Sequence, residues 1–144
     1  MPNSSGFSFL EIQVSLVLVS VSVVGIARLQ IETQSDIDHA YYVGQAYELI
    51  EETSRRIYLN SENGQRYLID DLSRVSSFSC NPCSPEQLVS LDHAHLANTL
   101  ISTFPGASAR VFSCPEGICM AVAWFDADVN SCASTEFCIE RPVW

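Results

Sequence analysis

None of the 144 residues is a lysine, and the seven basic residues are all arginines. With 17 acidic residues, the formal net charge is -10. A surface of this sign repels phosphate backbones and anionic lipid headgroups. The composition therefore argues against a nucleic-acid partner.

The short motifs of common enzymes are also missing. The chain has no phosphate-binding glycine loop, no Gly-x-Ser-x-Gly elbow and no His-Glu-x-x-His helix. His93 and His95 are two residues apart, so a helix would not place them on one face, and His39 is isolated. We interpret all three as ordinary surface or capping histidines and expect neither catalysis nor a cofactor.

Residues 126–130, Asp-Ala-Asp-Val-Asn, imitate the first half of a calcium-binding loop without completing it. Such a loop needs glycine at its sixth position and glutamate at its twelfth. This chain has Ser131 and Phe137 there. The sequence therefore predicts no resident metal ion.

The amino-terminal region lacks the basic head and the A-x-A-like cleavage site of a secretory signal peptide. From Phe7 to Leu29 the only charged side chains are Glu11 and Arg28. At about 1.5 Å per helical residue, this run spans roughly 34 Å, more than a hydrocarbon core of about 30 Å. We expect residues 7–29 to form a membrane-crossing helix.

Glu11 lies near the front of this run, where an ionised carboxylate costs about 2.5–3.5 kcal/mol on insertion scales and needs a partner. The string Gly-Phe-Ser-Phe-Leu-Glu at residues 6–11 resembles the leader junction of type IV prepilins and type II secretion pseudopilins. The resemblance implies that a prepilin peptidase cuts after Gly6 and that Phe7 is then N-methylated. Glu11 would occupy the fifth mature position, where the amine of Phe7, in this or a neighbouring subunit, could neutralise it.

The helix is expected to continue well past Leu29, because apolar or small residues recur there at three- and four-residue spacing. This expected stripe consists of Ile37, Ala40, Tyr41, Gly44, Tyr47, Ile50, Ile57 and Tyr58. Residues 60–64, Asn-Ser-Glu-Asn-Gly, then read as a stop and a turn. An amphipathic helix of any globular domain would show the same periodicity.

A second helix is predicted to begin at Ser84, which is followed by Pro85 at the first helical position and Gln87 at the third. Asp92 could cap a further turn of helix running to Ile101, before Pro105. This order, with its Cys-x-Pro-x-x-Leu stretch, resembles the type IV pilus modification proteins, the PilV-like minor pilins. A minor pseudopilin of type II secretion would share much of it.

The carboxy-terminal part has the pattern of β-strands. Residues 109–112 lead through a turn at 115–117 to a mostly apolar strand at 118–125, and residues 135–144 alternate apolar and acidic side chains. An antiparallel sheet packed on the amphipathic half of the first helix would bury these faces. The expected fold class is α+β, similar to that of type IV pilins.

Six cysteines in a chain of this length suit an oxidising compartment and leave many pairings open. Cys80 and Cys83 form a C-x-x-C motif, which could be a redox pair, part of a zinc site or a structural disulfide. Local pairs would join residues that flank a turn or a short loop, but long-range pairings are equally allowed. The disulfide candidates are Cys80, Cys83, Cys114, Cys119, Cys132 and Cys138.

Together the residues and the resemblance predict a leader peptide at 1–6, a transmembrane and assembly helix at 7–29, and a periplasmic globular domain at 30–144. The resemblance implies a minor type IV pilin, held in the inner membrane by a single span and then incorporated into the cell-surface pilus. Its partners would be other minor and major pilins, the prepilin peptidase, the assembly platform and membrane lipid.

Three other functions are compatible with the sequence. A type II secretion pseudopilin would differ in its partners. A tip-located adhesive module would carry an exposed aromatic patch, for example around Trp124 or Trp144. A membrane-anchored periplasmic enzyme would keep its amino terminus and have a cleft with converging polar groups.

Overall fold

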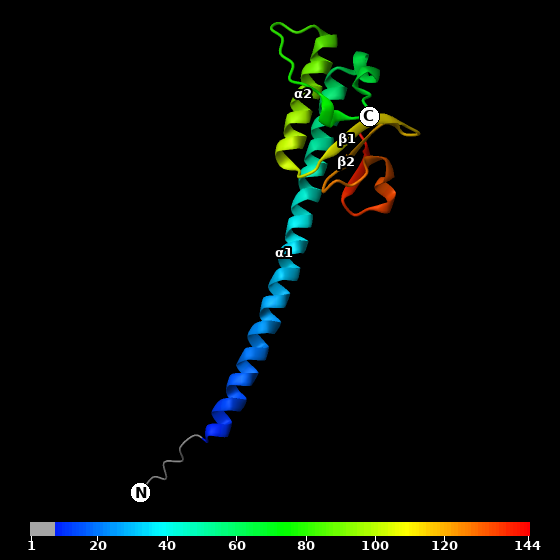
Figure 1. The fold of residues 1–144 in the computed structure, drawn as a ribbon. Helices are drawn as coiled ribbons and strands as arrows, with labels where there is room; N and C mark the ends of the chain where they lie inside the picture. Colours follow the sequence, from blue (N-terminus) through cyan, green and yellow to red (C-terminus); the bar gives the residue numbers. More distant parts are fainter. Residues whose placement is uncertain (1–7) are drawn as a thin grey trace. The chain divides into compact units, whose positions relative to one another are not determined.

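The computed structural model describes residues 8–144, and the fold is α+β as expected (Figure 1). The expected processing site at Gly6 and Phe7 lies outside the described residues. The elements are α1 (Phe9–Leu59), the 3₁₀ helices η1 (Ser61–Tyr67) and η2 (Leu72–Arg74), α2 (Pro85–Thr103), β1 (Ser108–Cys114), β2 (Gly117–Ala123), η3 (Val129–Ser134) and β3 (Cys138–Pro142).

The chain divides into two compact units, one ending at Ala40 and the other spanning Tyr41–Trp144. Both contain part of α1, so residues 30–40 of the expected globular domain, 30–144, fall in the first unit. Within the first unit every side chain from Ser8 to Asp38 is exposed. The hydroxyls of Ser20 and Ser22 donate to the carbonyls four residues earlier, at 2.7 and 2.8 Å, so these serines suit an apolar environment.

In the second unit α1 buries a different stripe from the one expected. Ile50 and Ile57 are buried as predicted, but Tyr41, Tyr47 and Tyr58 are exposed. The buried residues of α1 are Ala46, Leu49, Ile50, Thr53 and Ile57. Both stripes have the spacing of an α-helix, so the sequence of α1 alone does not determine which of them is buried. Packing of the rest of the unit against one face of the helix determines it. The Thr53 hydroxyl donates to the Leu49 carbonyl at 2.8 Å, which satisfies it inside the core.

The start of α2 matches the sequence prediction in detail. The Ser84 hydroxyl accepts from the Gln87 backbone N–H at 3.2 Å, and the Gln87 side chain accepts from the Ser84 N–H at 3.0 Å. The expected cap at Asp92 was wrong, because α2 runs unbroken from Pro85 to Thr103. Residues 60–64 were expected to form a stop and a turn; α1 does end at Leu59, and residues 61–67 form the 3₁₀ helix η1.

The three strands form an antiparallel sheet in the order β1-β2-β3. One face joins α1 and α2 in the main core of the second unit, where Met120, Val122 and Trp124 are fully buried. The other face carries Ala121 and Ala123, which pack with Val129 of η3 and Cys138. Ile69 extends the edge of β1 by exchanging backbone hydrogen bonds with Val111 at 2.8 and 2.9 Å.

The six cysteines form three disulfides: Cys80–Cys83, Cys114–Cys119 and Cys132–Cys138. All three are local, with Cα–Cα distances of 5.1, 5.8 and 5.0 Å. The second closes the turn between β1 and β2, and the third ties η3 to the start of β3. These bonds cross-link loops of the unit Tyr41–Trp144, whose three-stranded sheet is small.

Candidate functional site

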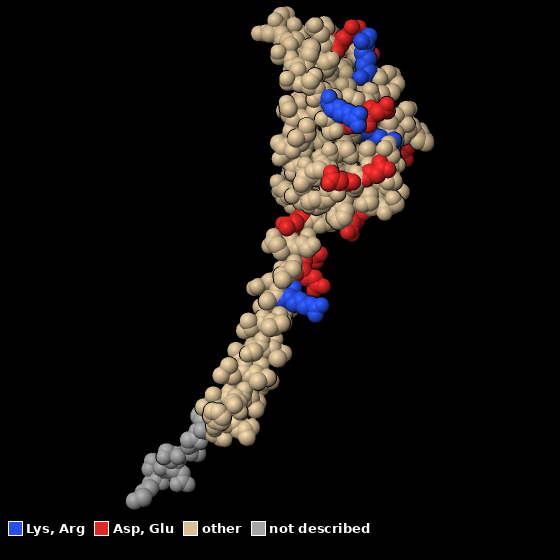
Figure 2. Space-filling model, viewed as in Figure 1, with Lys and Arg blue, Asp and Glu red and all other residues tan. Residues whose placement is uncertain are grey.

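The amino-terminal part of α1 has a continuous apolar surface, and the unit that ends at Ala40 leaves this surface exposed. Its exposed large side chains are Phe9, Leu10, Ile12, Val14, Leu16, Val17, Leu18, Val19, Val21, Val23, Val24, Ile26 and Leu29. On the face shown in Figure 2, this stretch is almost bare of charge. By length and composition α1 is able to cross a membrane. An exposed apolar surface of this extent is typical of a region that contacts lipid or other apolar helices.

Glu11 lies in the first turn of α1 and its side chain is exposed. Its backbone N–H donates to the Ser8 carbonyl at 3.0 Å. Among residues 8–144 the Glu11 carboxylate makes no ion pair. The first turn favours a negative charge through the helix dipole, but the carboxylate still needs a cation once the surrounding surface is apolar.

A charge network missed by the sequence analysis lies between α1, η1 and α2 in the second unit. One nitrogen of the Arg56 guanidinium donates to the Asp92 carboxylate at 2.5 Å, and another donates to Glu52 at 2.6 Å. The Tyr67 hydroxyl donates to the second oxygen of Asp92 at 2.5 Å. Asp92 was expected to cap a helix. Its carboxylate instead accepts one hydrogen bond from Arg56 of α1 and one from Tyr67 of η1, and so links these two elements to α2.

Burial and this network shift the pKa values of Tyr67, Glu52 and Arg56. Burial and the hydrogen bond to Asp92 raise the pKa of Tyr67 to about 12. Burial would raise the pKa of Glu52, but hydrogen bonding and attraction from Arg56, with a smaller contribution from His95, bring it below its usual value. Burial also opposes the charge on Arg56, yet its two carboxylate partners raise its pKa. Glu52 and Arg56 are therefore both charged at neutral pH.

The histidines of α2 differ from each other, and the expectation for His93 was wrong. His93 is buried, donates from Nε2 to the Tyr67 carbonyl at 3.1 Å, and meets the Tyr67 ring edge to face. His95 is exposed, with Nε2 3.2 Å from a carboxylate oxygen of Glu52. Burial lowers the pKa of His93, despite the hydrogen bond to Tyr67 and the nearby charge of Asp92.

The lowered pKa of His93 predicts that the protein loses stability in mild acid. The folded state binds the proton less readily than the unfolded state, so the free energy of unfolding falls as the pH drops below about 6.5, by at most about 1.4 kcal/mol per pH unit. Urea unfolding between pH 5 and 7.5 measures this. His93→Gln should flatten the dependence, whereas His95→Gln should retain it; an equal slope in His93→Gln would contradict the assignment.

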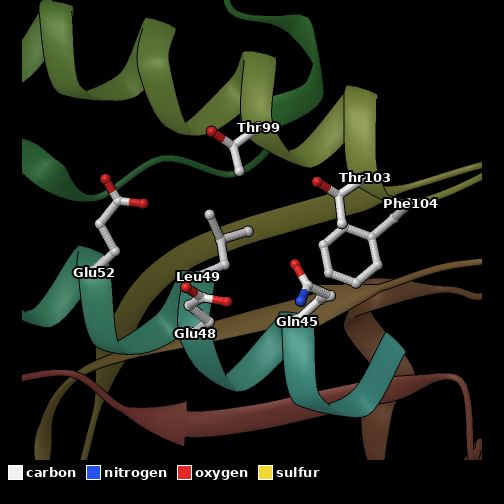
Figure 3. Close-up of a pocket in the computed structure, with 7 residues that line it drawn as sticks. All are labelled: Gln45, Glu48, Leu49, Glu52, Thr99, Thr103 and Phe104. Carbon is white, nitrogen blue, oxygen red and sulfur yellow. The ribbon is translucent and has the colours of Figure 1, made fainter. Parts of the chain in front are cut away.

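A hollow between α1 and α2, of about 150 Å³, is shown in Figure 3. Gln45, Glu48 and Glu52 come from α1, while Thr99 and Thr103 face them from α2. Leu49 and Phe104 supply the apolar part of its lining. Glu48 and Glu52 place two carboxylates on successive turns of α1, with hydroxyls across from them. Of these two carboxylates, Glu52 is already paired with Arg56 and lies 3.2 Å from His95, so its charge is largely balanced within the unit.

Side chains able to bind a metal do not gather at one place in the part of the chain that the structure describes. No three histidine, cysteine, aspartate or glutamate side chains lie there as a metal-binding group. Each of the six cysteines is in a disulfide, so the zinc alternative has no thiolate ligands. Asp128 accepts from the Asn130 backbone and side-chain nitrogens at 2.9 and 3.0 Å, and these hydrogen bonds lower its pKa. It starts η3 instead of a calcium loop.

The two tryptophans do not form the aromatic patch that an adhesive module would need. Trp124 is fully buried and its ring lies 5.9 Å from that of Phe104. Trp144 is half exposed.

Comparison with known proteins identifies no relative: no family model, no curated protein and no solved structure matches the chain.

Proposed function

We propose that the chain is a minor type IV pilin, a structural subunit that co-assembles with other pilins to prime, modify or decorate the pilus. The observation that carries the proposal is the Gly-Phe-Ser-x-x-Glu junction at the start of an apolar stretch in which every side chain from Ser8 to Asp38 is exposed. A long amino-terminal helix followed by a small antiparallel sheet is the arrangement expected of such subunits.

In this role the prepilin peptidase first removes residues 1–6 at the inner membrane. Everything that the chain itself then does is non-covalent. During assembly its helix exchanges lipid for the apolar helices of neighbouring pilins. Glu11 pairs with an amino-terminal amine, which keeps the charge from being buried alone. The unit Tyr41–Trp144 stays in the periplasm and afterwards on the fibre, where its three disulfides fit an oxidising environment.

The proposal is tested by the location of the protein in its native host. A tagged chain should appear in sheared surface filaments, and deletion of the gene should reduce the number of filaments or change what they bind. A chain that stays entirely in the membrane fraction, with filaments unaffected by its deletion, would contradict the proposal. Loss of protein secretion with normal pili would instead indicate a type II secretion pseudopilin.

A further inference from the structure

The loop between η2 and α2 has few restraints besides a covalent bond. It runs from Val75 to Ser84, and Figure 1 shows it (green) at the amino-terminal end of α2. The side chains of residues 76–79 are all exposed. No backbone hydrogen bond in the described part of the chain involves residues 76–83. The disulfide Cys80–Cys83 is therefore the principal restraint on the path of this loop.

Of the three disulfides, this is the one in which neither cysteine is buried. Cys80 and Cys83 are both half-buried, and the residues beside them in sequence are exposed. In the other two bonds, Cys119 of β2 and Cys138 of β3 are only 6% and 9% exposed. A thiolate breaks a disulfide by attacking one of its sulfurs, so the rate depends on access to that sulfur. The Cys80–Cys83 bond is the most open of the three to attack.

Cys83 lies directly before α2, whose N-cap is Ser84. The amino-terminal end of a helix stabilises a thiolate beside it, and a stabilised thiolate is a better leaving group. Glu86 in the first turn opposes this effect, but its carboxylate is paired with the Arg66 guanidinium at 3.0 Å. The bond joins residues only three apart in the chain, so it restrains the unfolded chain little and its loss should leave the unit folded.

We propose that the Cys80–Cys83 disulfide is an exchange site that a dithiol protein reversibly reduces. A thiolate of that protein attacks Sγ of Cys80, the bond between the two sulfurs breaks, and its electron pair leaves on Sγ of Cys83, which takes up a proton. The second thiolate of the partner then attacks the mixed disulfide and releases Cys80, whose sulfur also takes up a proton. This chain gains two electrons and two protons, and the partner ends as a disulfide.

The chain is the substrate of this exchange and not the oxidoreductase. All three strands of the sheet pair antiparallel, whereas a thioredoxin-like enzyme carries its C-x-x-C motif in a strand-helix-strand unit. Reduction removes the restraint on residues 76–83 and so changes the surface around Phe78, which is 38% exposed. The inference rests on the unit Tyr41–Trp144 and does not depend on the pilus role.

The test uses the full chain in nanodiscs of uncharged lipid, with reduced thioredoxin as the dithiol probe and N-ethylmaleimide as the quench. Tryptic cleavage after Arg74 and Arg110 leaves Cys80 and Cys83 alone in one peptide, while the other four cysteines lie in residues 111–144. We expect the peptide 75–110 to acquire two maleimide groups at least about tenfold faster than the second peptide acquires any.

A second readout follows the loop itself. Chymotryptic cleavage after the exposed Phe78 should become faster on reduction, while the fluorescence of buried Trp124 stays unchanged. Cys80→Ser with Cys83→Ser is the matched variant. It should be cut at Phe78 at the rate of the reduced protein and should not respond to thioredoxin.

Three results would overturn the proposal. The two peptides could react at equal rates, or the first could react only in urea that also changes the Trp124 fluorescence. Reduction by dithiothreitol but not by thioredoxin would show an accessible bond that the dithiol protein does not attack. Cleavage at Phe78 that is the same before and after reduction would show that the disulfide does not restrain the loop.

Discussion

Replacing Glu11 by valine should remove the protein from filaments while leaving it in the membrane. The substitution deletes a charge that costs about 2.5–3.5 kcal/mol in a bilayer, so insertion should be at least as favourable as before. It also deletes the group proposed to meet an amino-terminal amine in the assembled fibre. We expect the ratio of sheared-filament to membrane protein to fall at least about tenfold, equivalent to 1.4 kcal/mol of assembly free energy.

Glu32→Val provides the matched control, because Glu32 is an exposed carboxylate of the same helix beyond the expected membrane span. It undergoes the same change of side chain and should enter filaments normally. Quantitative immunoblots of the two fractions give the comparison. Incorporation of Glu11→Val at the wild-type level would show that Glu11 is not an assembly contact, whatever anchors the protein. A matching loss in Glu32→Val would show a general requirement for acidic residues on α1.

Replacing Asp92 by asparagine should lower the free energy of unfolding by about 2 kcal/mol, more than an exposed ion pair contributes and less than breaking a fully buried one costs, because Asp92 is buried but Arg56 only partly. Asp92 is 9% exposed and accepts hydrogen bonds from both Arg56 and Tyr67. The neutral amide keeps the size of the side chain but leaves the guanidinium of Arg56 with Glu52 alone. Urea unfolding followed by the fluorescence of buried Trp124 measures the difference.

Glu86→Gln breaks an ion pair of the same chemistry in a different environment. Its partner Arg66 lies 3.0 Å away, but both side chains are more than half exposed. An exposed pair contributes at most about 1 kcal/mol, so this variant should stay within that loss. If Asp92→Asn and Glu86→Gln cost the same, the network between α1, η1 and α2 would be a surface feature and not part of the core.

Several elements could be predicted because their signals are local. The apolar run of α1 exceeds the length of any ordinary strand, and an apolar run of this length indicates a membrane-crossing helix. The capping box at Ser84 needs only residues three apart, and it sets the start of α2 correctly. The strands followed from short apolar runs separated by the turn that precedes Gly117. Each of these depends on neighbours along the chain.

Features set by packing were harder to predict. The predicted apolar stripe of α1 included the tyrosines at 41, 47 and 58, which are exposed, and left out Ala46 and Leu49, which are buried. Two overlapping stripes of helical period cannot be separated without knowing which elements cover them. Asp92 did carry a signal, because it shares a helical face with Val89 and Leu96. Its partners Arg56 and Tyr67 are distant in sequence, so the network could not be predicted from local sequence patterns.

The central claim depends most directly on what happens at Gly6 and Phe7. Intact mass and amino-terminal fragmentation of the membrane-extracted protein from its native host would measure this. We predict loss of Met-Pro-Asn-Ser-Ser-Gly and a methylated amine on Phe7. A protein that retains Met1, with an unmodified Phe7 inside the chain, would contradict the prepilin pathway and leave α1 as a simple membrane anchor.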